Sequence, residues 1–258
     1  MTSFEWYYDF VIRSRILQPH LSTTENEIFN NISKILRSWG GDSIVDIKLS
    51  GSRAKGTATN LSSDMDIFVS LSNNNNYALS HIYHSCYEAL SKEYSTTRKQ
   101  NVSIGIDIDF LNNDHIHVDV VPAKRQSPYG SDHSLYKNKT KSWVKTNIDT
   151  HIKQIVKSGR QNDIVALKIW RDLNKINFPS IYLECFALEY LKGRPIEHCA
   201  SNFYHLLYAI ANNIEQKVIY DPANTNNILS NELTKSEKSD LAMHARSAYS
   251  KNILDLLR

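Results

Sequence analysis

Apolar positions in the first half of the chain follow two different spacings. Residues 22–41 have helical spacing, with a capping box of Ser22 and Glu25 at the start and glycines at the end, and they predict a helix. Apolar residues at alternating positions predict strands over 43–49, 63–69, 102–111 and 115–121. Helical spacing predicts a second helix over 77–93. We expect the aromatic-rich residues 1–21 to form a helix packed against the body of the protein.

A polar turn over residues 112–114 separates the last two strands and predicts a β-hairpin. Alternation places Asp119 on the face of the second strand that also carries His117 and Val121. Pro122 follows directly, and we expect it to end the strand because proline cannot donate a hydrogen bond to a sheet ladder.

From about Thr146 onward the apolar spacing becomes helical. Thr146 or Asn147 is expected to cap a helix that ends near Gly159. Further helices are predicted over 163–173, 180–191, 201–213 and 236–257. This change of spacing predicts an α+β protein with an α/β lobe over residues 1–145, which includes the N-terminal helices, and a helical lobe over 146–258.

Composition limits the function classes only weakly. The chain has 258 residues, 41% of them apolar, and 30 Lys and Arg against 27 Asp and Glu, which gives a formal charge of +3. The positive charge is concentrated over residues 124–145, where six basic residues accompany one acid and the aromatic residues Tyr129, Tyr136 and Trp143. This segment is suited to binding nucleic acid or a regulatory protein, and equally to being a solvated connection between the lobes.

The cysteines and the apolar runs predict a cytoplasmic protein. Cys86, Cys185 and Cys199 have no metal-ligand spacing and cannot all pair, which favours a reducing compartment. The N-terminal residues lack the uninterrupted apolar run of a signal peptide. Elsewhere no apolar run approaches the roughly 20 residues that a membrane span needs, and we expect no contact with a membrane.

The candidate chemistry lies in the Gly51-Ser52 turn and the strand that follows it. Asp64 and Asp66 are two residues apart in a strand, so their carboxylates point the same way and repel each other unless a cation lies between them. Mg²⁺ prefers such oxygen ligands and commonly also takes phosphate oxygens. Gly51 and Ser52 offer backbone N–H groups and a hydroxyl to a phosphate.

A third acid, Asp119, interrupts an apolar run ending in Val120-Val121-Pro122, and a buried carboxylate there would need a partner such as a metal. Asp107 and Asp109 form a second alternating acid pair, which we interpret as a solvated strand face because no phosphate-binding turn precedes it. On this interpretation, Asp107→Asn leaves activity largely intact. The histidines show no ligand spacing and are not needed for a Mg²⁺ site; they are His115, His117, His133 and His151.

Several motifs together resemble the polymerase-β-type nucleotidyltransferase superfamily. The most similar branch holds the 2′-5′-oligoadenylate synthases, the bacterial cyclic-oligonucleotide synthases (CD-NTases) and the class I CCA-adding enzymes. The resemblance runs from about residue 45 to about residue 230. It rests on Gly51-Ser52, Gly56-Thr57, Ser63-Asp-Met-Asp66, His117-Val-Asp-Val-Val-Pro122, Trp143 to His151, Ala166-Leu-Lys-Ile-Trp170, Phe178-Pro-Ser-Ile-Tyr-Leu-Glu184 and Asp221 to Asn227.

The resemblance implies a nucleotidyltransferase α/β lobe with a mixed sheet, a helical C-terminal lobe, and an active site in the cleft between them. It implies that Asp64, Asp66 and Asp119 are catalytic and bind two Mg²⁺ ions, with Mn²⁺ as an alternative. It also implies that the triphosphate of the donor nucleotide contacts Gly51, Ser52, Lys168 and Ser180. Some relatives stack the base on an aromatic residue directly after this serine; here that position is Ile181, and Tyr182, which follows, is the candidate nucleotide-binding residue.

The expected reaction joins nucleoside triphosphates into cyclic or short linear oligonucleotide second messengers and releases pyrophosphate, in bacterial anti-phage signalling. Two alternatives remain open. An RNA-terminal, CCA-adding-like enzyme is disfavoured because only about 30 residues follow the Asp221 to Asn227 segment. A catalytically silent nucleotide or RNA sensor is disfavoured because all three acids are present. The bases, the linkage, the activating signal and the oligomeric state stay open.

Overall fold

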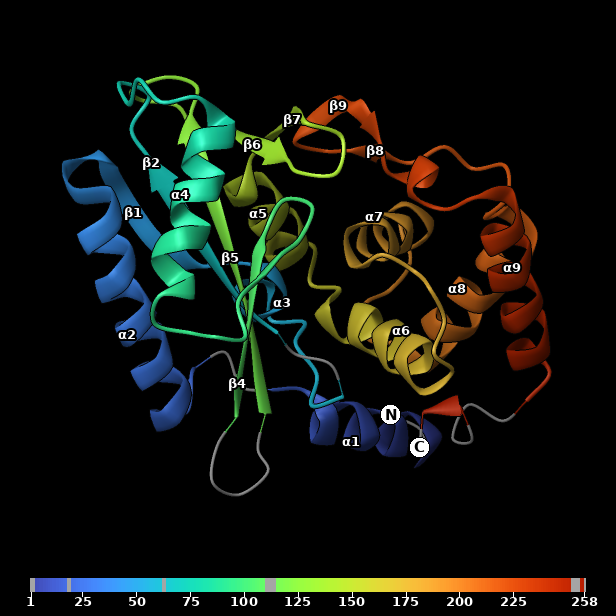
Figure 1. Ribbon diagram of the computed structural model, residues 1–258. Coiled ribbons are helices and arrows are strands. Elements are labelled where there is room, and N and C mark those ends of the chain that lie inside the picture. Colours follow the sequence, from blue (N-terminus) through green and yellow to red (C-terminus); the bar gives the residue numbers. More distant parts are fainter. Residues whose placement is uncertain (1–2, 18–19, 62–63, 110–114, 252–255, 258) are drawn as a thin grey trace. The chain divides into compact units, whose positions relative to one another are not determined.

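The computed structural model describes residues 3–17, 20–61, 64–109, 115–251 and 256–257 (Figure 1). The chain divides into two compact units, which we name by their content. The sheet unit comprises residues 18–54 and 63–152, and the helical unit comprises residues 1–17, 55–62 and 153–258. The predicted turn over residues 112–114 lies outside the described residues.

This division differs from the two ranges expected from the sequence, 1–145 and 146–258. Residues 1–17 belong to the helical unit because Tyr8 and Ile12 are buried in its core. Residues 55–62 belong to it as well, and backbone hydrogen bonds tie them to the end of the first helix, from Leu17 N to Ala58 O and from Asn60 N to Arg15 O. Long-range packing, which has no local sequence signal, decides both assignments.

Within the described part of the sheet unit, seven paired strands form the sheet. Their bounds are β1 Ile44–Leu49, β2 Met65–Leu71, β3 Arg98–Lys99, β4 Ile104–Asp109, β5 His115–Arg125, β6 His133–Lys137 and β7 Ser142–Thr146. The order is β1-β2-β5-β4-β3, with β6 paired to β5 and β7 to β6. β2 and β5 are parallel and the other neighbours are antiparallel, so the predicted mixed sheet is confirmed.

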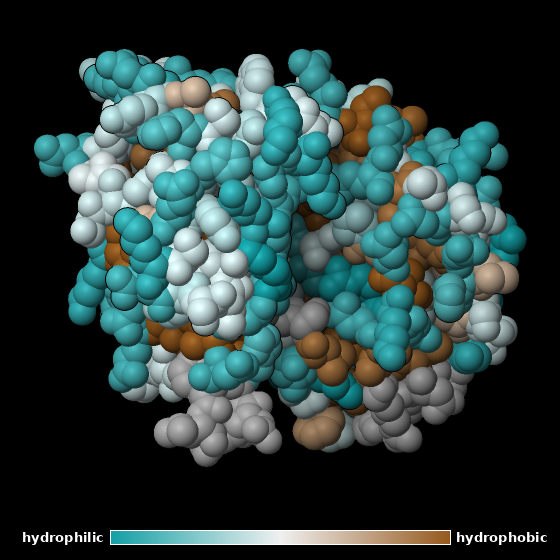
Figure 2. Space-filling model, viewed as in Figure 1, coloured by the Kyte–Doolittle hydropathy of each residue, from teal (hydrophilic) through white to brown (hydrophobic). Residues whose placement is uncertain are grey.

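Two helices, α2 (Thr23–Gly40) and α4 (Leu79–Ser91), pack together against one face of this sheet (Figure 1). The predicted capping box of Ser22 and Glu25 is present, and Gly41 ends α2 with a positive φ of 48° before a short 3-10 turn, Gly41–Ser43. Hydrophilic side chains predominate over the viewed side of the sheet unit, because both helices turn their apolar faces inward (Figure 2).

Alternation along β2 and β5 separates an apolar face from a polar one. Met65, Ile67 and Val69 point into the core beneath α2 and α4, as do Val118 and Val120. The intervening residues of both strands therefore lie on the opposite face of the sheet. This opposite face carries the candidate acids.

Pro122 does not end its strand, contrary to the prediction. β5 continues to Arg125, and Pro122 pairs in register with Val69 of β2. On its other side, β5 pairs with β4 only as far as Val120 and with β6 only from Lys124. The proline lies between these two partners, so among the described residues it has a ladder partner on β2 alone, which lowers the number of backbone donors that this position needs.

The basic segment is an integral part of the sheet. It contains the end of β5 together with β6 and β7, which corrects its interpretation as a connection between lobes. Tyr136 is buried, whereas Tyr129 and Trp143 are exposed. Asp132 accepts hydrogen bonds from Asn147 and Lys145, and these bonds lower the pKa of its carboxyl.

Helices form most of the helical unit. Their bounds are α1 Ser3–Arg15, α6 Gln161–Leu173, α7 Ser180–Tyr190, α8 Cys199–Asn213 and α9 Lys235–Tyr249, with a small hairpin of β8 Tyr220–Asp221 and β9 Asn224–Ile228 and a 3-10 turn Leu229–Glu232. Trp170, Phe186 and Phe203 are among the large side chains of the core. α9 ends eight residues before the predicted residue 257, and it begins with an additional capping box of Thr234 and Glu237.

Two further short elements occur where the units divide along the chain. α5 (Ile148–Ser158) begins after Asn147, whose side chain accepts a hydrogen bond from the backbone N–H of Thr150 and acts as the predicted cap. α3 (Gly51–Lys55) forms where a turn was expected, so Gly51 and Ser52 are the first residues of a short helix.

Candidate active site

Three neighbouring strands bring polar side chains to one face of the sheet. Asp66 of β2 and Asp119 of β5 are register partners in the parallel ladder. Asp107 of β4 is likewise the register partner of His117 of β5. The alternation of β5 puts His117 and Asp119 on the same face, so all four side chains lie on the side away from α2 and α4.

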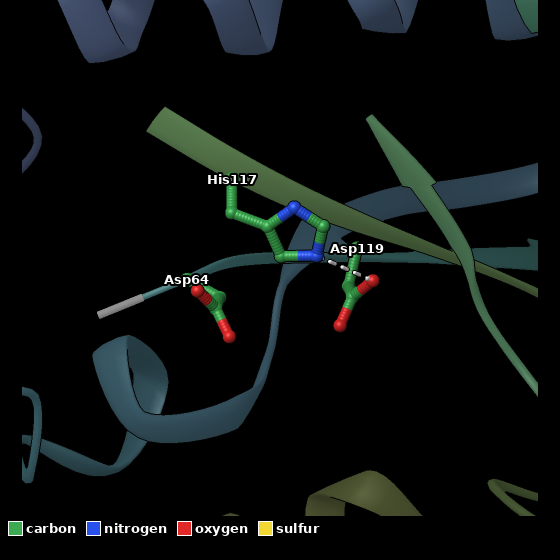
Figure 3. A group of neighbouring side chains, drawn as sticks. All are labelled: Asp64, His117 and Asp119. Atoms are coloured by element: carbon green, nitrogen blue, oxygen red, sulfur yellow. Dashed lines mark hydrogen bonds and ion pairs between the residues drawn. The ribbon is translucent and has the colours of Figure 1, made fainter. Parts of the chain in front are cut away.

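Asp64, His117 and Asp119 form a compact group on this face. Each offers one ligand atom, and these atoms all lie within 4.8 Å of one another. Their side chains point toward a common space, and Nε2 of His117 lies 3.2 Å from Oδ1 of Asp119 (Figure 3). Partial burial raises the pKa of the Asp64 carboxyl; the negative charge of Asp119 raises it further, while His117 opposes this. A cation would relieve the repulsion between the two carboxylates.

Asp66 contacts a different part of the site. Its carboxylate lies against Gly51, where an added Cβ would overlap with it, and its carbonyl accepts a hydrogen bond of 2.8 Å from Ser50 N–H. Gly51 has a φ of +56°, so the backbone reaches this position in a conformation that favours glycine. The acid, the glycine and Ser52 are therefore adjacent, as expected for a metal beside a phosphate-binding turn.

The donor set fits a divalent cation. Asp64 and Asp119 supply carboxylate oxygens, His117 supplies an imidazole nitrogen, and Asp66 is the register partner of Asp119 on the neighbouring strand. Carboxylate oxygens suit Mg²⁺ and Mn²⁺, and imidazole suits first-row transition metals. The sequence prediction named the three acids and left out the histidine.

The interpretation of Asp107 and Asp109 as one solvated pair is wrong for Asp107. The side chain of Asp109 is 80% exposed, but that of Asp107 is only 26% exposed. Asp107 forms an ion pair with Arg98 and lies 2.7 Å from Nδ1 of His117. The cross-strand register, which the sequence does not reveal, brings Asp107 to the histidine.

His117 is the site residue that sequence reasoning missed. Its signal was present, since it lies two residues before Asp119 in an alternating strand and must share the face of that acid. Spacing between histidines does not reveal this site, because the other ligand groups near His117 are carboxylates on the same face of the sheet.

The predicted nucleotide-binding residues belong to different units. Gly51 and Ser52 belong to the sheet unit, and Lys168, Ser180 and Tyr182 belong to the helical unit. The roles of Gly51, Ser52, Lys168 and Ser180 stay predictions.

Lys168 is buried in the helical unit, with 3% of its surface exposed. Its ammonium donates to Oε1 of Glu184 at 2.8 Å and to the hydroxyl of Thr57 at 3.0 Å, and Lys55 donates to Oε2 of the same carboxylate at 2.7 Å. Burial alone would raise the pKa of Glu184, but Lys168 and Lys55 lower it to about 2. One carboxylate thus holds two lysines, and through them links α6 and α7 to residues 55–57.

Ser180 is the first residue of α7, and Pro179 precedes it as the N-cap without a side-chain capping bond. Ser180 is therefore not the N-cap of α7. Its hydroxyl instead accepts a hydrogen bond of 2.9 Å from Nη1 of Arg171, which also donates to the carbonyl of Phe178. A guanidinium is thus adjacent to the serine predicted to reach the triphosphate.

Tyr182 does not stand ready to stack on a base. Its ring is fully buried and packs edge-on against Phe178 and near Phe186. Residues 182–187 of α7 are buried in succession, so this part of the helix is enclosed on every side and Tyr182 lies within the core. The structure corrects its assignment as a nucleotide-binding residue.

Comparison with known proteins shows the family of this chain. Residues 1–158 match the family model described as the Second Messenger Oligonucleotide or Dinucleotide Synthetase domain, SMODS. The chain belongs to this family. SMODS proteins are CD-NTases, which make cyclic oligonucleotide second messengers from nucleoside triphosphates, and this SMODS chain is a nucleotidyltransferase.

Solved CD-NTase structures share the fold of this SMODS chain. CdnG of Bradyrhizobium diazoefficiens in complex with GTP has a TM-score of 0.76 at 12% identity, with 96% of this chain and 90% of that chain covered. CdnC of E. coli MS115-1 in complex with HORMA-deltaN has a TM-score of 0.73 at 17% identity, with the same two coverages. CdnE of Elizabethkingia meningoseptica with GTP and Apcpp has a TM-score of 0.65 at 15% identity, with 96% and 99% covered.

No curated protein matches the sequence of this SMODS chain significantly. Among the described residues, none of the helices has the length and apolar character needed to cross a membrane.

Proposed function

We propose that this chain is a divalent-metal-dependent synthase that joins nucleoside triphosphates into cyclic or short linear oligonucleotides and releases pyrophosphate. The observation that carries the proposal is the convergence of Asp64 and Asp119 within a chain of the SMODS family, with Asp66 in register beside Asp119. Two carboxylates on adjacent parallel strands repel each other, and a cation between or beside them would offset this repulsion.

Each acid has a role in this reaction. Asp64 and Asp66 would hold the metals, and Asp119 would complete the metal site and help to take the proton of the attacking hydroxyl. When bound, Mg²⁺ or Mn²⁺ neutralises the charge that develops on the non-bridging phosphate oxygens. The roles of these residues rest on the resemblance and on the placement of their side chains.

We assign the donor triphosphate to the start of α3, and within the helical unit Ser180 and Lys168 stay predicted triphosphate contacts. Gly51 lies against the Asp66 carboxylate and Ser52 follows it in α3, so we assign the backbone N–H groups and the hydroxyl of this helix start to the phosphates. Ser180 lies next to the guanidinium of Arg171, which suits a phosphate oxygen. Lys168 can contribute a direct contact only if its ion pair with Glu184 opens, and otherwise it contributes positive potential from a buried position.

A product assay tests the proposal. Purified protein is incubated with each labelled nucleoside triphosphate, and with their mixture, in Mg²⁺ or Mn²⁺. We expect pyrophosphate release and small products that resist phosphatase, and we expect the double variant Asp64→Asn with Asp66→Asn to release none. Activity that appears only after addition of RNA 3′ ends would overturn the synthase in favour of an RNA-terminal transferase, and wild-type protein inactive in every metal and mixture would overturn both.

We place this activity in anti-phage signalling and expect a regulatory partner. One structural relative, CdnC, was solved in complex with HORMA-deltaN, which supports regulation by a protein partner. On this chain the basic segment 124–145, with exposed Tyr129 and Trp143, is the surface we assign to such a partner or to nucleic acid. Plaque counts on a bacterial host carrying the wild-type chain or the double variant test the signalling role, and unchanged counts would contradict it.

A further inference from the structure

His117 lies between two carboxylates on the polar face of the sheet. Its Nδ1 is 2.7 Å from Oδ1 of Asp107, and its Nε2 is 3.2 Å from Oδ1 of Asp119. Only 14% of its side chain is exposed. Neighbouring strands fix both contacts, because Asp107 is the register partner of His117 and Asp119 follows two residues later.

The contact between Nδ1 and Asp107 favours the tautomer of His117 that has a lone pair at Nε2. A neutral imidazole that donates Nδ1–H to a carboxylate has its lone pair at Nε2. Here Nε2 faces Asp119 and Asp64, whose oxygens are also acceptors, so three lone-pair donors converge within 4.8 Å. Metal-ligating histidines almost always donate their second N–H to a carboxylate or carbonyl, and Asp107 meets this description.

The other polar groups around the ring are accounted for. Nη2 of Arg98 lies 3.2 Å from Nδ1 and 3.5 Å from Nε2, and the same guanidinium forms the ion pair with Asp107. Nε2 of Gln100 lies 3.4 Å from Nε2 of His117, at the outer limit of a hydrogen bond. Arg98 balances the charge of Asp107, and a ligand at Nε2 would replace the two long contacts of Nε2 with Arg98 and Gln100.

We propose that His117 is a direct metal ligand together with Asp64 and Asp119, that Asp107 orients it, and that the chain consequently binds Mn²⁺ in preference to Mg²⁺. The role of this metal in catalysis rests on the proposed function, whereas the binding of the metal by the chain does not depend on it. Mg²⁺ is a hard ion that prefers oxygen ligands, whereas Mn²⁺, although it also binds carboxylate oxygens, is a first-row transition metal and accepts an imidazole nitrogen more readily than Mg²⁺ does. The histidine therefore converts an oxygen-only site into one that selects for the transition metal.

Electron spin echo spectroscopy of Mn²⁺ bound to the full chain tests coordination directly. The sample contains Mn²⁺ without nucleotide, in a nitrogen-free buffer, so any nitrogen coupled to the metal comes from the protein. We expect nitrogen modulation in the wild type, its loss in His117→Ala and in His117→Gln, and its retention in the control His81→Ala. Absence of nitrogen modulation in the metal-loaded wild type would overturn the proposal.

Direct binding measurements test the selectivity. Calorimetric titrations with Mn²⁺ alone and with Mg²⁺ alone give the ratio of the two affinities for each variant. We expect His117→Ala to lower the preference for Mn²⁺ by at least about tenfold, mainly through weaker Mn²⁺ binding. An unchanged ratio in both His117 variants contradicts the inference.

Asp107 is tested as a positioning residue. We expect Asp107→Ala to weaken Mn²⁺ binding by about 10- to 100-fold, and Asp107→Asn, which keeps an acceptor for Nδ1–H, to retain part of the affinity. The matched control is Asp109→Ala on the same face of β4, where the side chain is 80% exposed. A purely structural role would lower the melting temperature of the metal-free protein without this graded loss, and equal effects of Asp107→Ala and Asp109→Ala would contradict the assignment.

The failure of this inference and the failure of the proposed function are distinguishable. If Mn²⁺ shows histidine-dependent nitrogen coupling but no nucleotide is consumed, the metal site stands and the synthase proposal fails. If pyrophosphate is released and His117→Ala leaves the spectrum and the affinity ratio unchanged, the synthase proposal stands and the histidine ligand is wrong.

Discussion

The carboxylate of Asp66 lies directly against the backbone of Gly51, at a place that a Cβ atom would occupy. The two residues are 15 positions apart, yet the end of β1, the start of α3 and the first residues of β2 bring them together. This contact couples the predicted phosphate-binding turn to the acidic site. A substitution at either residue should therefore disturb the other.

Gly51→Ala should abolish most activity because its methyl group would displace the Asp66 carboxylate from its position. The expected loss is about 10²–10³-fold in pyrophosphate release, the scale on which one catalytic group acts. The matched control is Gly41→Ala, which has a similar positive φ of 48° but no heavy atom within 4 Å of the added Cβ. Equal losses of activity in the two variants would mean that backbone strain, and not the contact with Asp66, explains the effect.

Asp119→Asn should reduce pyrophosphate release by about 10²–10³-fold or more while leaving the fold intact, because the change removes a charge that repels Asp64. Asp109→Asn, on the neighbouring strand with an 80% exposed side chain, should keep near-wild-type activity. Steady-state rates at saturating nucleotide, with melting temperatures of both variants, provide the measurement. A fully active Asp119→Asn variant would remove Asp119 from the site.

Glu184→Gln should destabilise the helical unit by about 3–5 kcal/mol, because it leaves the buried ammonium groups of Lys168 and Lys55 without their charged partner. The control is Glu189→Gln, since Glu189 pairs with Lys192 and Lys217 at the surface, where such pairs contribute less than about 1 kcal/mol. Denaturant unfolding gives both values. Similar losses for the two variants would show that the buried network adds no special stability.

The contribution of Glu184 should disappear in acid. Its pKa is about 2 in the folded chain and 4.5 as the ordinary value, so its stabilisation is complete above about pH 4.5 and is lost as the pH falls toward 2. The contribution of Asp163 to the free energy of unfolding changes with pH in the opposite direction. Burial raises the pKa of its carboxyl to about 6, so its stabilisation is lost as the pH rises from 3.8 through 6.

The measurement is therefore the difference in unfolding free energy between wild type and Glu184→Gln at each pH, in which the contribution of Asp163 cancels. This difference should shrink by about 3 kcal/mol between pH 4.5 and 2. A difference that stays constant across this window would show that Glu184 is not held in its charged form by the two lysines.

Local patterns in the sequence determined which elements form and which face each acid takes. Alternation placed Asp66 on one face of its strand and Asp119 on one face of another, and the capping box of Ser22 and Glu25 marked the start of α2. These features depend on backbone periodicity and on bonds between residues a few positions apart, which a single sequence displays directly.

Only the tertiary structure decided which of these faces meet and which side chains are buried. Asp107 contacts His117 because β4 pairs with β5 in one particular register, and Tyr182 is enclosed in the core because residues 182–187 of α7 are buried in succession. Register and burial follow from packing between segments far apart in the chain, and a shift of one residue would reverse every side chain. The sequence therefore identified the acids, while the fold supplied the histidine that lies between them.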